Sequence, residues 1–290
     1  MADEHKDIDA VTGTATTGHD WDGIRELNTP LPRWWLWTFY ICILWAIGYW
    51  VVYPAWPLLK GSTEGITAWH ARSAVVEDIA ALNVLRGPMV ERLTKASLND
   101  IVKDPQLLDF ARAQGRPAFA DNCAPCHGAG GGGAKGYPNL NDDDWLWGGK
   151  LSDIENSIRH GARNGDKEDH EGNMPAFAGV LKPNEISAVA DYARSLSGLP
   201  AEEGVDLALG KKVFADNCAV CHGENGKGNH ELGSANLTDQ IWLYGSDKAT
   251  IVQGIQNGRG GVMPAWNGRL SEPIIKALTV YVYSFGGGEK

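Results

Sequence analysis

Cysteine, methionine and positive charge are all scarce in this chain. Of its 290 residues, five are cysteine and four are methionine. Four of the cysteines form two C-x-x-C pairs that are each followed by histidine, which isolated disulfides would not need. Lys and Arg number 26 against 36 Asp and Glu, a net charge of −10 that makes nucleic acid an unlikely partner. This acidic balance suits a basic protein partner, or solubility alone.

Convincing alternation of apolar and polar residues is also lacking, so the sequence predicts no sheet. Helical apolar spacing is present in LSDIENSIRHG and DKATIVQGIQNG, each closed by glycine, and in the two segments KPNEISAVADYARSLSG and SEPIIKALTVYVYSFGG. Glycine-rich stretches at residues 128–136 and 223–233 are expected to be loops. The expected fold class is all-α.

One long run has no formal charge at all. The 26 residues between Arg33 and Lys60 are uncharged, and about 20 apolar residues cross a bilayer as a helix. Tryptophans and tyrosines cluster at both ends of this run, as in the aromatic belts of membrane proteins. The polar lead of about 30 residues is too long and acidic for a cleaved signal peptide, so we expect an uncleaved anchor in the lipid bilayer.

The remainder of the chain contains a tandem repeat. FADNCAPCHG from Phe119 returns as FADNCAVCHG from Phe214, an offset of 95 residues. MPAF from Met174 matches MPAW from Met263. Further matches are Gly115 with Gly210, Trp145 with Trp242, and Tyr192 with Tyr281. Each unit is the size of a small domain and too long for a solenoid repeat.

C-x-x-C-H is the attachment signature of c-type haem. Two thiols one helical turn apart can form thioether bonds to the two vinyl groups, and the adjacent histidine can bind the iron. A thioredoxin-like pair needs no histidine, and a zinc knuckle needs further ligands at fixed spacing. The sequence therefore predicts two covalently bound haem c groups, held by Cys123, Cys126, His127, Cys218, Cys221 and His222.

Methionine supplies the expected distal ligands. Met174 and Met263 follow the two histidines by 47 and 41 residues, each in an M-P-A-aromatic segment. A thioether opposite histidine is the ligand pair of electron-transfer cytochromes c and leaves no open position for oxygen or peroxide. The axial iron ligands are thus predicted to be His127, Met174, His222 and Met263, with no catalytic residues. Ligation within each repeat is the simplest inference from spacing.

Other residues near the motifs have weaker assignments. Aromatic candidates for haem edges or propionates, with core packing equally expected, are Tyr137, Trp145, Trp242 and Tyr244. Arginines that could pair with propionates, though solvated surface is the commoner role, are Arg159, Arg163 and Arg259. Residues expected at the surface are His160, His170 and His230. Residues without an assigned redox role are Cys42, His70 and Met89.

These features divide the chain into five parts. They are a cytoplasmic N-terminal tail (1–30), a transmembrane anchor (31–58), a helical spacer (59–112) and two cytochrome c domains (113–199 and 200–290). Because haem c is attached outside the bacterial cytoplasmic membrane, the haem domains are expected in the periplasm. The chain is then a single-pass protein of the bacterial inner membrane with a cytoplasmic N-terminus.

The block HDWDGIRELNTPLPRWWLWTFYICILWAIGYWVVYPAWP, followed by two cytochrome c units, closely resembles the di-haem subunit III of cbb3-type cytochrome c oxidases. The resemblance covers essentially the whole chain. It implies a subunit that is no enzyme by itself but belongs to an oxygen-reducing, proton-translocating complex. It also implies electron flow from a donor cytochrome c, through this subunit, to the mono-haem c subunit and the haem–copper catalytic subunit.

The resemblance leaves one ligation question and several functions open. In this family each methionine could also reach the haem of the other unit, and the sequence does not decide between the two arrangements. Rival functions are a free-standing membrane-anchored di-haem shuttle, a di-haem peroxidase, and a sensing or assembly role. Co-purification with a copper-containing oxidase would separate the first rival, and peroxide turnover the second.

Overall fold

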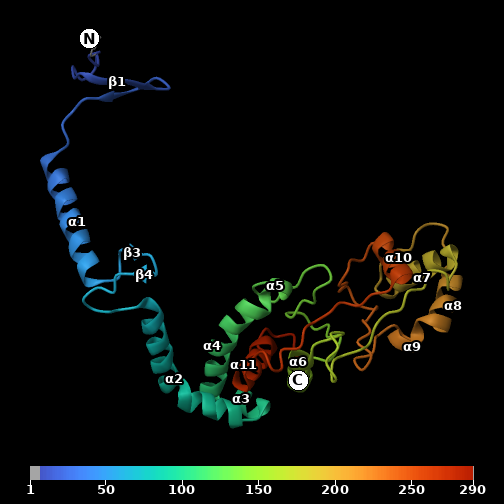
Figure 1. Cartoon of the computed structure of the whole chain (residues 1–290). Helices are drawn as coiled ribbons and strands as arrows, with labels where there is room; N and C mark the ends of the chain where they lie inside the picture. The colour runs from blue at the N-terminus through green and yellow to red at the C-terminus, as the bar shows by residue number, and fades with distance from the viewer. Residues whose placement is uncertain (1–6, 290) are drawn as a thin grey trace. The chain divides into compact units, whose positions relative to one another are not determined.

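The computed structural model describes residues 7–289, so residues 1–6 of the expected tail and residue 290 lie outside the described part. The chain divides into two compact units, one ending at Leu85 and the other beginning at Arg86 (Figure 1). The first unit holds the tail, the anchor and most of a long helix, whereas the second holds both haem motifs.

The tail contains a β-hairpin that the sequence analysis did not predict. Strand β1 (Thr16–Trp21) pairs antiparallel with β2 (Ile24–Leu27). Asp22 and Gly23 join them with φ of 52° and 89°, the left-handed conformations of a two-residue turn that favours Asp-Gly. This dipeptide was the overlooked signal. A second small hairpin joins β3 (Pro57–Leu58) to β4 (Gly61–Ser62).

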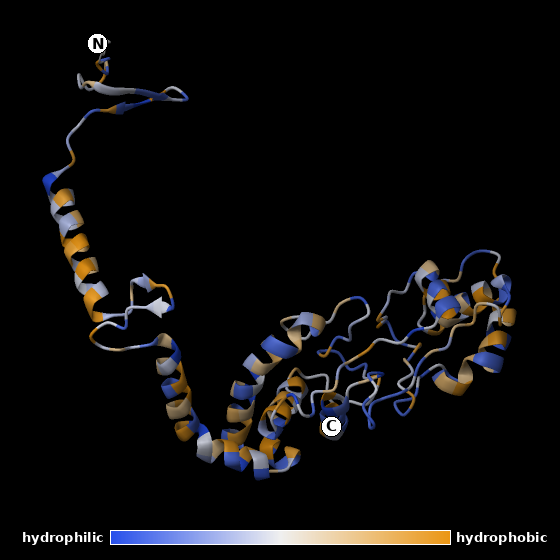
Figure 2. Cartoon of the chain, viewed as in Figure 1, coloured by the Kyte–Doolittle hydropathy of each residue, from blue (hydrophilic) through white to orange (hydrophobic). Residues whose placement is uncertain are grey.

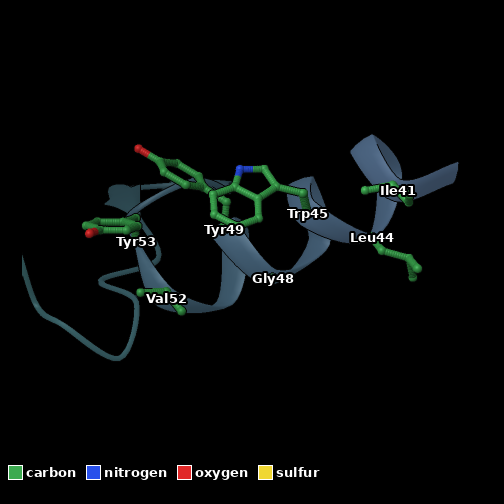
Figure 3. Close-up of a pocket in the computed structure, with 7 residues that line it drawn as sticks. All are labelled: Ile41, Leu44, Trp45, Gly48, Tyr49, Val52 and Tyr53. Carbon is green, nitrogen blue, oxygen red and sulfur yellow. The ribbon is translucent and has the colours of Figure 1, made fainter. Parts of the chain in front are cut away.

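Helix α1 (Arg33–Val52) is the membrane-spanning candidate. Its 20 residues extend about 30 Å at 1.5 Å per residue, enough for the hydrocarbon core. It ends where Tyr53 becomes extended before Pro54, as proline requires of the residue that precedes it. No α1 residue is buried by the rest of the chain, and Figure 2 shows the helix as predominantly apolar. An apolar hollow on this helix is lined by residues that include Trp45, Gly48 and Tyr49 (Figure 3).

The spacer is helical, as expected. It contains α2 (Ala71–Lys95), α3 (Leu98–Lys103) and the first half of α4 (Pro105–Asn122). Ser97 and Asp104 cap α3 and α4, because their side chains accept hydrogen bonds from the first free backbone N–H groups. An apolar cluster that includes Leu93 and Ile101 fastens α2 and α3 to α4, so the second unit begins upstream of residue 113.

The remaining helices are short and separated by loops. They are α5 (Ala124–His127), α6 (Leu151–His160), α7 (Pro183–Leu196), α8 (Leu207–Asn217), α9 (Ala219–His222), α10 (Lys248–Asn257) and α11 (Glu272–Tyr283). Both glycine-rich stretches are loops, as predicted. Apart from the two small hairpins, the all-α class is confirmed.

Helix packing crosses the two sequence repeats. Helix α11, from the second repeat, packs on α4 and α6 of the first, while α7, from the first repeat, packs on α8 and α10 of the second. One core contains Phe119, Ile158 and Leu278. The other contains Val189 and Phe214. The predicted boundary at residues 199 and 200 therefore describes the repeat in the sequence, whereas packing groups the helices across it.

Two glycines allow these helices to approach closely. At Gly115 of α4, a Cβ atom would overlap the Ala277 carbonyl and the Tyr281 side chain of α11. At Gly210 of α8, it would overlap the Ala188 carbonyl and the Tyr192 side chain of α7. The matched pairs Gly115 with Gly210 and Tyr192 with Tyr281 thus meet crosswise.

Candidate haem sites

Each C-x-x-C-H motif forms one tight helical turn. In the first motif, the backbone N–H groups of Cys126 and His127 both donate to the Cys123 carbonyl, at 3.1 and 2.9 Å. In the second, Cys221 and His222 donate to the Cys218 carbonyl at the same distances. This turn brings two thiols and one imidazole to each attachment site, as the spacing predicts.

A backbone carbonyl orients each histidine ring. His127 Nδ1 lies 2.9 Å from the Pro138 carbonyl oxygen, and His222 Nδ1 lies 2.9 Å from that of Ala235. A carbonyl can only accept, so Nδ1 carries the proton and Nε2 retains its lone pair. Burial lowers the pKa of His222, which favours the neutral ring that binds metals.

The first thiol of each motif is partly buried. Burial, followed by the neighbouring Cys126 thiol, raises the pKa of Cys123 to about 11. Burial, followed by Cys221, raises the pKa of Cys218 to about 11 as well. Without haem, both thiols are therefore protonated near neutral pH.

The two methionines lie in backbone ladders beside the ends of helices α6 and α10. Met263 and Ala162 exchange two backbone hydrogen bonds of 2.9 Å just after α6. Met174 and Arg259 exchange bonds of 3.0 and 3.1 Å just after α10. Each methionine segment is thus attached to a helix of the other repeat.

Glycines permit both attachments. Gly161 and Gly258 follow α6 and α10 with φ of 69° and 75°, conformations that favour glycine. A Cβ atom at Gly161 would overlap the Met263 carbonyl, and one at Gly258 would overlap that of Met174. Only glycine allows this close approach of the methionine segments.

The side chains follow the same crosswise order. Met174 and Phe177 pack against the core that contains Phe214, and Cys218 packs against the same core. Trp266, three residues after Met263, packs against the core that contains Phe119, as does Cys123. Each methionine segment therefore packs against the core that contains the C-x-x-C-H motif of the other repeat, and not against that of its own repeat as the spacing first suggested.

An unpartnered donor tests whether haem fits. Trp242 Nε1 is buried and makes no hydrogen bond to any residue from 7 to 289, although a buried indole N–H normally has a partner. Its repeat equivalent, Trp145 Nε1, donates to the Gly287 carbonyl at 2.6 Å. A haem propionate would satisfy the Trp242 donor, so the residues present fit a haem c in the second motif.

The candidate arginines have partners within the chain. Arg159 forms ion pairs with Glu272 and, at 2.9 Å, with Glu155. Arg259 lies 4.3 Å from the Tyr244 ring and donates to the Thr250 carbonyl at 3.1 Å. Arg163 donates to two backbone carbonyls and has an unexpected position between the methionine segments.

The remaining predicted residues contact neighbours outside the two motifs or lie at the surface. His160 was expected at the surface, but its side chain is only 12% exposed and pairs with Asp166 and Glu168; His230 is exposed, as expected. Met89 packs against the α2–α4 core as a gap filler. Exposed residues are Cys42, His70 and Tyr137.

His170 differs from its expected surface position. Its ring stacks on Trp147 with 4.2 Å between centroids and 7° between planes, and Nε2 lies 3.0 Å from Ser157 Oγ. Burial, followed by the charge of Arg163, lowers its pKa. Sequence reasoning overlooked Trp147, and the tryptophan-rich DWLWGG segment was the available signal.

Family models match three parts of the chain. Residues 13–60 match the N-terminal domain of cytochrome oxidase-cbb3, FixP. Residues 113–197 match cytochrome c, and residues 205–282 match cytochrome c oxidase, cbb3-type, subunit III. The three matches follow the predicted order of anchor and two cytochrome units.

Curated relatives are similar over nearly the full length. The cbb3-type cytochrome c oxidase subunit FixP of Azorhizobium caulinodans is 64% identical over 285 residues, 98% of this chain and 97% of the relative. FixP of Bradyrhizobium sp. is 59% identical, with both chains covered completely. The subunit CcoP of Cereibacter sphaeroides is 48% identical over 94% of this chain and 95% of the relative.

Proposed function

Because the chain belongs to the FixP/CcoP family of cbb3-type cytochrome c oxidase subunits, we propose that it relays electrons through two covalently bound haem c groups. The observation that carries this proposal is the pair of C-x-x-C-H turns, each with a histidine whose Nδ1 is engaged by a carbonyl. When bound, haem c supplies a one-electron carrier. The rival functions of free shuttle and peroxidase are not favoured.

The protein's own residues hold and orient the haem groups. Cys123, Cys126 and His127 hold the first, and Cys218, Cys221 and His222 hold the second. With methionine as the second axial ligand, neither iron has an open position for a substrate. The subunit is therefore non-catalytic, and oxygen reduction belongs to the haem–copper subunit of the complex.

The methionine ligands are exchanged between the repeats in this proposal. Met174 serves the haem of His222, and Met263 serves the haem of His127. Support comes from the packing of Met174 against the same core as Cys218, and from the ladder that joins Met263 to Ala162 at the end of α6. Exchange of the methionine ligands is also consistent with the backbone pairing, in which each methionine segment pairs with residues at the end of a helix from the other repeat.

Methionine-to-histidine substitutions test the exchange. Cys123→Ala would leave the first haem attached by one thioether, and its intact vinyl group would mark that haem in the visible spectrum. In this background, Met174→His should lower the potential of the unmarked haem, because imidazole favours ferric iron more than a thioether does. Met263→His should lower that of the marked haem. The reverse assignment would show ligation within each repeat.

Location and partners follow from the same chemistry. Helix α1 anchors the protein in the bacterial inner membrane, with the haem region in the periplasm and the N-terminus in the cytoplasm. The donor is a cytochrome c with a basic docking face, which the acidic residues 113–290, with 22 Asp and Glu against 16 Lys and Arg, would attract. The acceptor is the mono-haem c subunit, which passes electrons to the haem–copper subunit.

A further inference from the structure

One guanidinium group lies between the two methionine segments. Arg163 Nε donates to the Gly261 carbonyl oxygen and Nη1 to that of Gly172, each at 2.5 Å. Gly172 precedes Met174 by two residues, and Gly261 precedes Met263 by two. A single side chain therefore binds equivalent carbonyls of both repeats.

The position of Arg163 is well supported by its surroundings. Its backbone is left-handed, with φ of 53°, and its N–H donates to the His170 carbonyl at 2.9 Å. Its guanidinium carbon lies 5.6 Å from the centre of the Trp147 ring, on which His170 also stacks. A cation over a tryptophan ring is a favourable arrangement that limits the orientations of the side chain.

Loop carbonyls are the only hydrogen-bond partners of this guanidinium within residues 7–289. It forms no ion pair there, and burial lowers its pKa despite the opposing influence of Tyr244 and Asp169. A partly buried cation without a carboxylate is stabilised by fixed dipoles, here the two carbonyls. If either methionine loop moved away, the guanidinium of Arg163 would lose one of its two carbonyl partners. The position of each loop therefore affects the stability of the other loop's position.

The first repeat contains this arginine, and the second repeat has no equivalent of it. Aligning Gly161 with Gly258, the two glycines that follow α6 and α10, places Arg163 opposite Gly260. The second repeat therefore has no side chain at this position, and both loops depend on Arg163.

We propose that Arg163 is a positioning residue that couples the two methionine loops, so that the ligand geometry at each haem depends on both. This inference rests on the proposed haem ligation. Arginine is required because its planar fork can bind two carbonyls at once, whereas lysine presents a single ammonium group.

Redox titration of the complete oxidase complex, with ferric ligand-field spectra, tests this coupling. Arg163→Gln should shift the midpoint potentials of both haems and weaken both methionine–iron signatures. Arg163→Lys keeps the charge but loses the fork, and should shift both potentials in the same direction by a smaller amount. Should the Gln variant fail to assemble, the Lys variant decides.

Three control variants define what would overturn the proposal. Arg269→Gln removes an exposed cation that lies 5.7 Å from the Trp266 ring, and so measures the effect of charge alone. Gly161→Ala and Gly258→Ala each disturb one methionine loop directly, and through Arg163 each should shift both potentials, with the larger shift at the haem which that loop serves. The proposal fails if Arg163→Gln shifts only one potential, or shifts both no more than Arg269→Gln. Absence of two His/Met haems in the unaltered protein would instead overturn the proposed function.

Discussion

At the residue scale, Asp144 is the carboxylate with the clearest pH signature. Burial, followed by repulsion from Asp239, raises its pKa to about 6 from an ordinary value of 3.8. The folded state therefore retains a proton that the unfolded chain has already released. By linkage, this group makes stability fall as pH rises from about 4 to about 6, and the loss is complete above that range.

Asp144→Asn should remove this penalty. After allowance for solvent screening of a partly exposed group, the variant should be more stable than the parent by about 1 kcal/mol at pH 7 and by much less at pH 4. Denaturant unfolding at the two pH values measures the difference. Asp109→Asn, which removes an exposed carboxylate from α4, is the control. An equal gain for Asp144→Asn at both pH values would contradict the assignment.

Residue-level prediction from sequence is most specific where the chemistry sets the spacing. Two thiols and an imidazole must share one turn to serve one porphyrin, so C-x-x-C-H identifies its residues without a structure. The carbonyl partners of His127 and His222 could not be predicted, because any loop residue can supply a carbonyl. Arg163 was assigned to a propionate or the surface, since nothing local indicates that it binds carbonyls 9 and 98 residues away.

At the element scale, the α4–α11 crossing depends on Gly115. Gly115→Ala should displace α11, because the new methyl group would overlap the Ala277 backbone. We expect a loss of about 1–3 kcal/mol in the free energy of unfolding, as for other overpacked cores. Denaturant titration of the detergent-solubilised protein measures it.

Gly87→Ala in α2 is the matched control. Its Cβ would meet no atom within 4 Å, and the higher helix propensity of alanine is offset by the steric restriction on a residue that precedes proline, here Pro88, so stability should change little. Similar losses of stability for both variants would show that the cost of Gly115→Ala does not come from contact with α11.

Helix partners are harder to predict than helices. Apolar spacing and glycine stops indicated α6, α7, α10 and α11, and the structure has each of them. The two repeats offer nearly identical grooves, at Gly115 and Gly210, so the sequence gives α7 and α11 two similar docking sites each. The choice depends on connecting loops and side-chain fit, neither of which a repeat alignment contains. The tail hairpin was overlooked because its strands are short and exposed.

At the scale of the whole molecule, the chain combines an apolar anchor with an acidic haem region. Composition alone indicated both parts, because a 26-residue uncharged run, and an excess of 22 Asp and Glu over 16 Lys and Arg in residues 113–290, are visible without any fold. In the proposed function both irons are capped by histidine and methionine, so electron delivery depends on encounter with a donor. Electrostatic attraction over about one Debye length then sets the encounter rate.

The rate of reduction by a basic cytochrome c should therefore fall steeply with ionic strength. Between about 10 and 200 mM salt, we expect a loss of roughly tenfold or more in the second-order rate constant, because screening removes the long-range attraction. Stopped-flow reduction of the assembled oxidase by a basic donor measures this constant. An acidic cytochrome c of similar potential is the control, and its rate should rise or stay constant with salt. Equal salt dependence for both donors would show that the net negative charge of the subunit does not guide its partner.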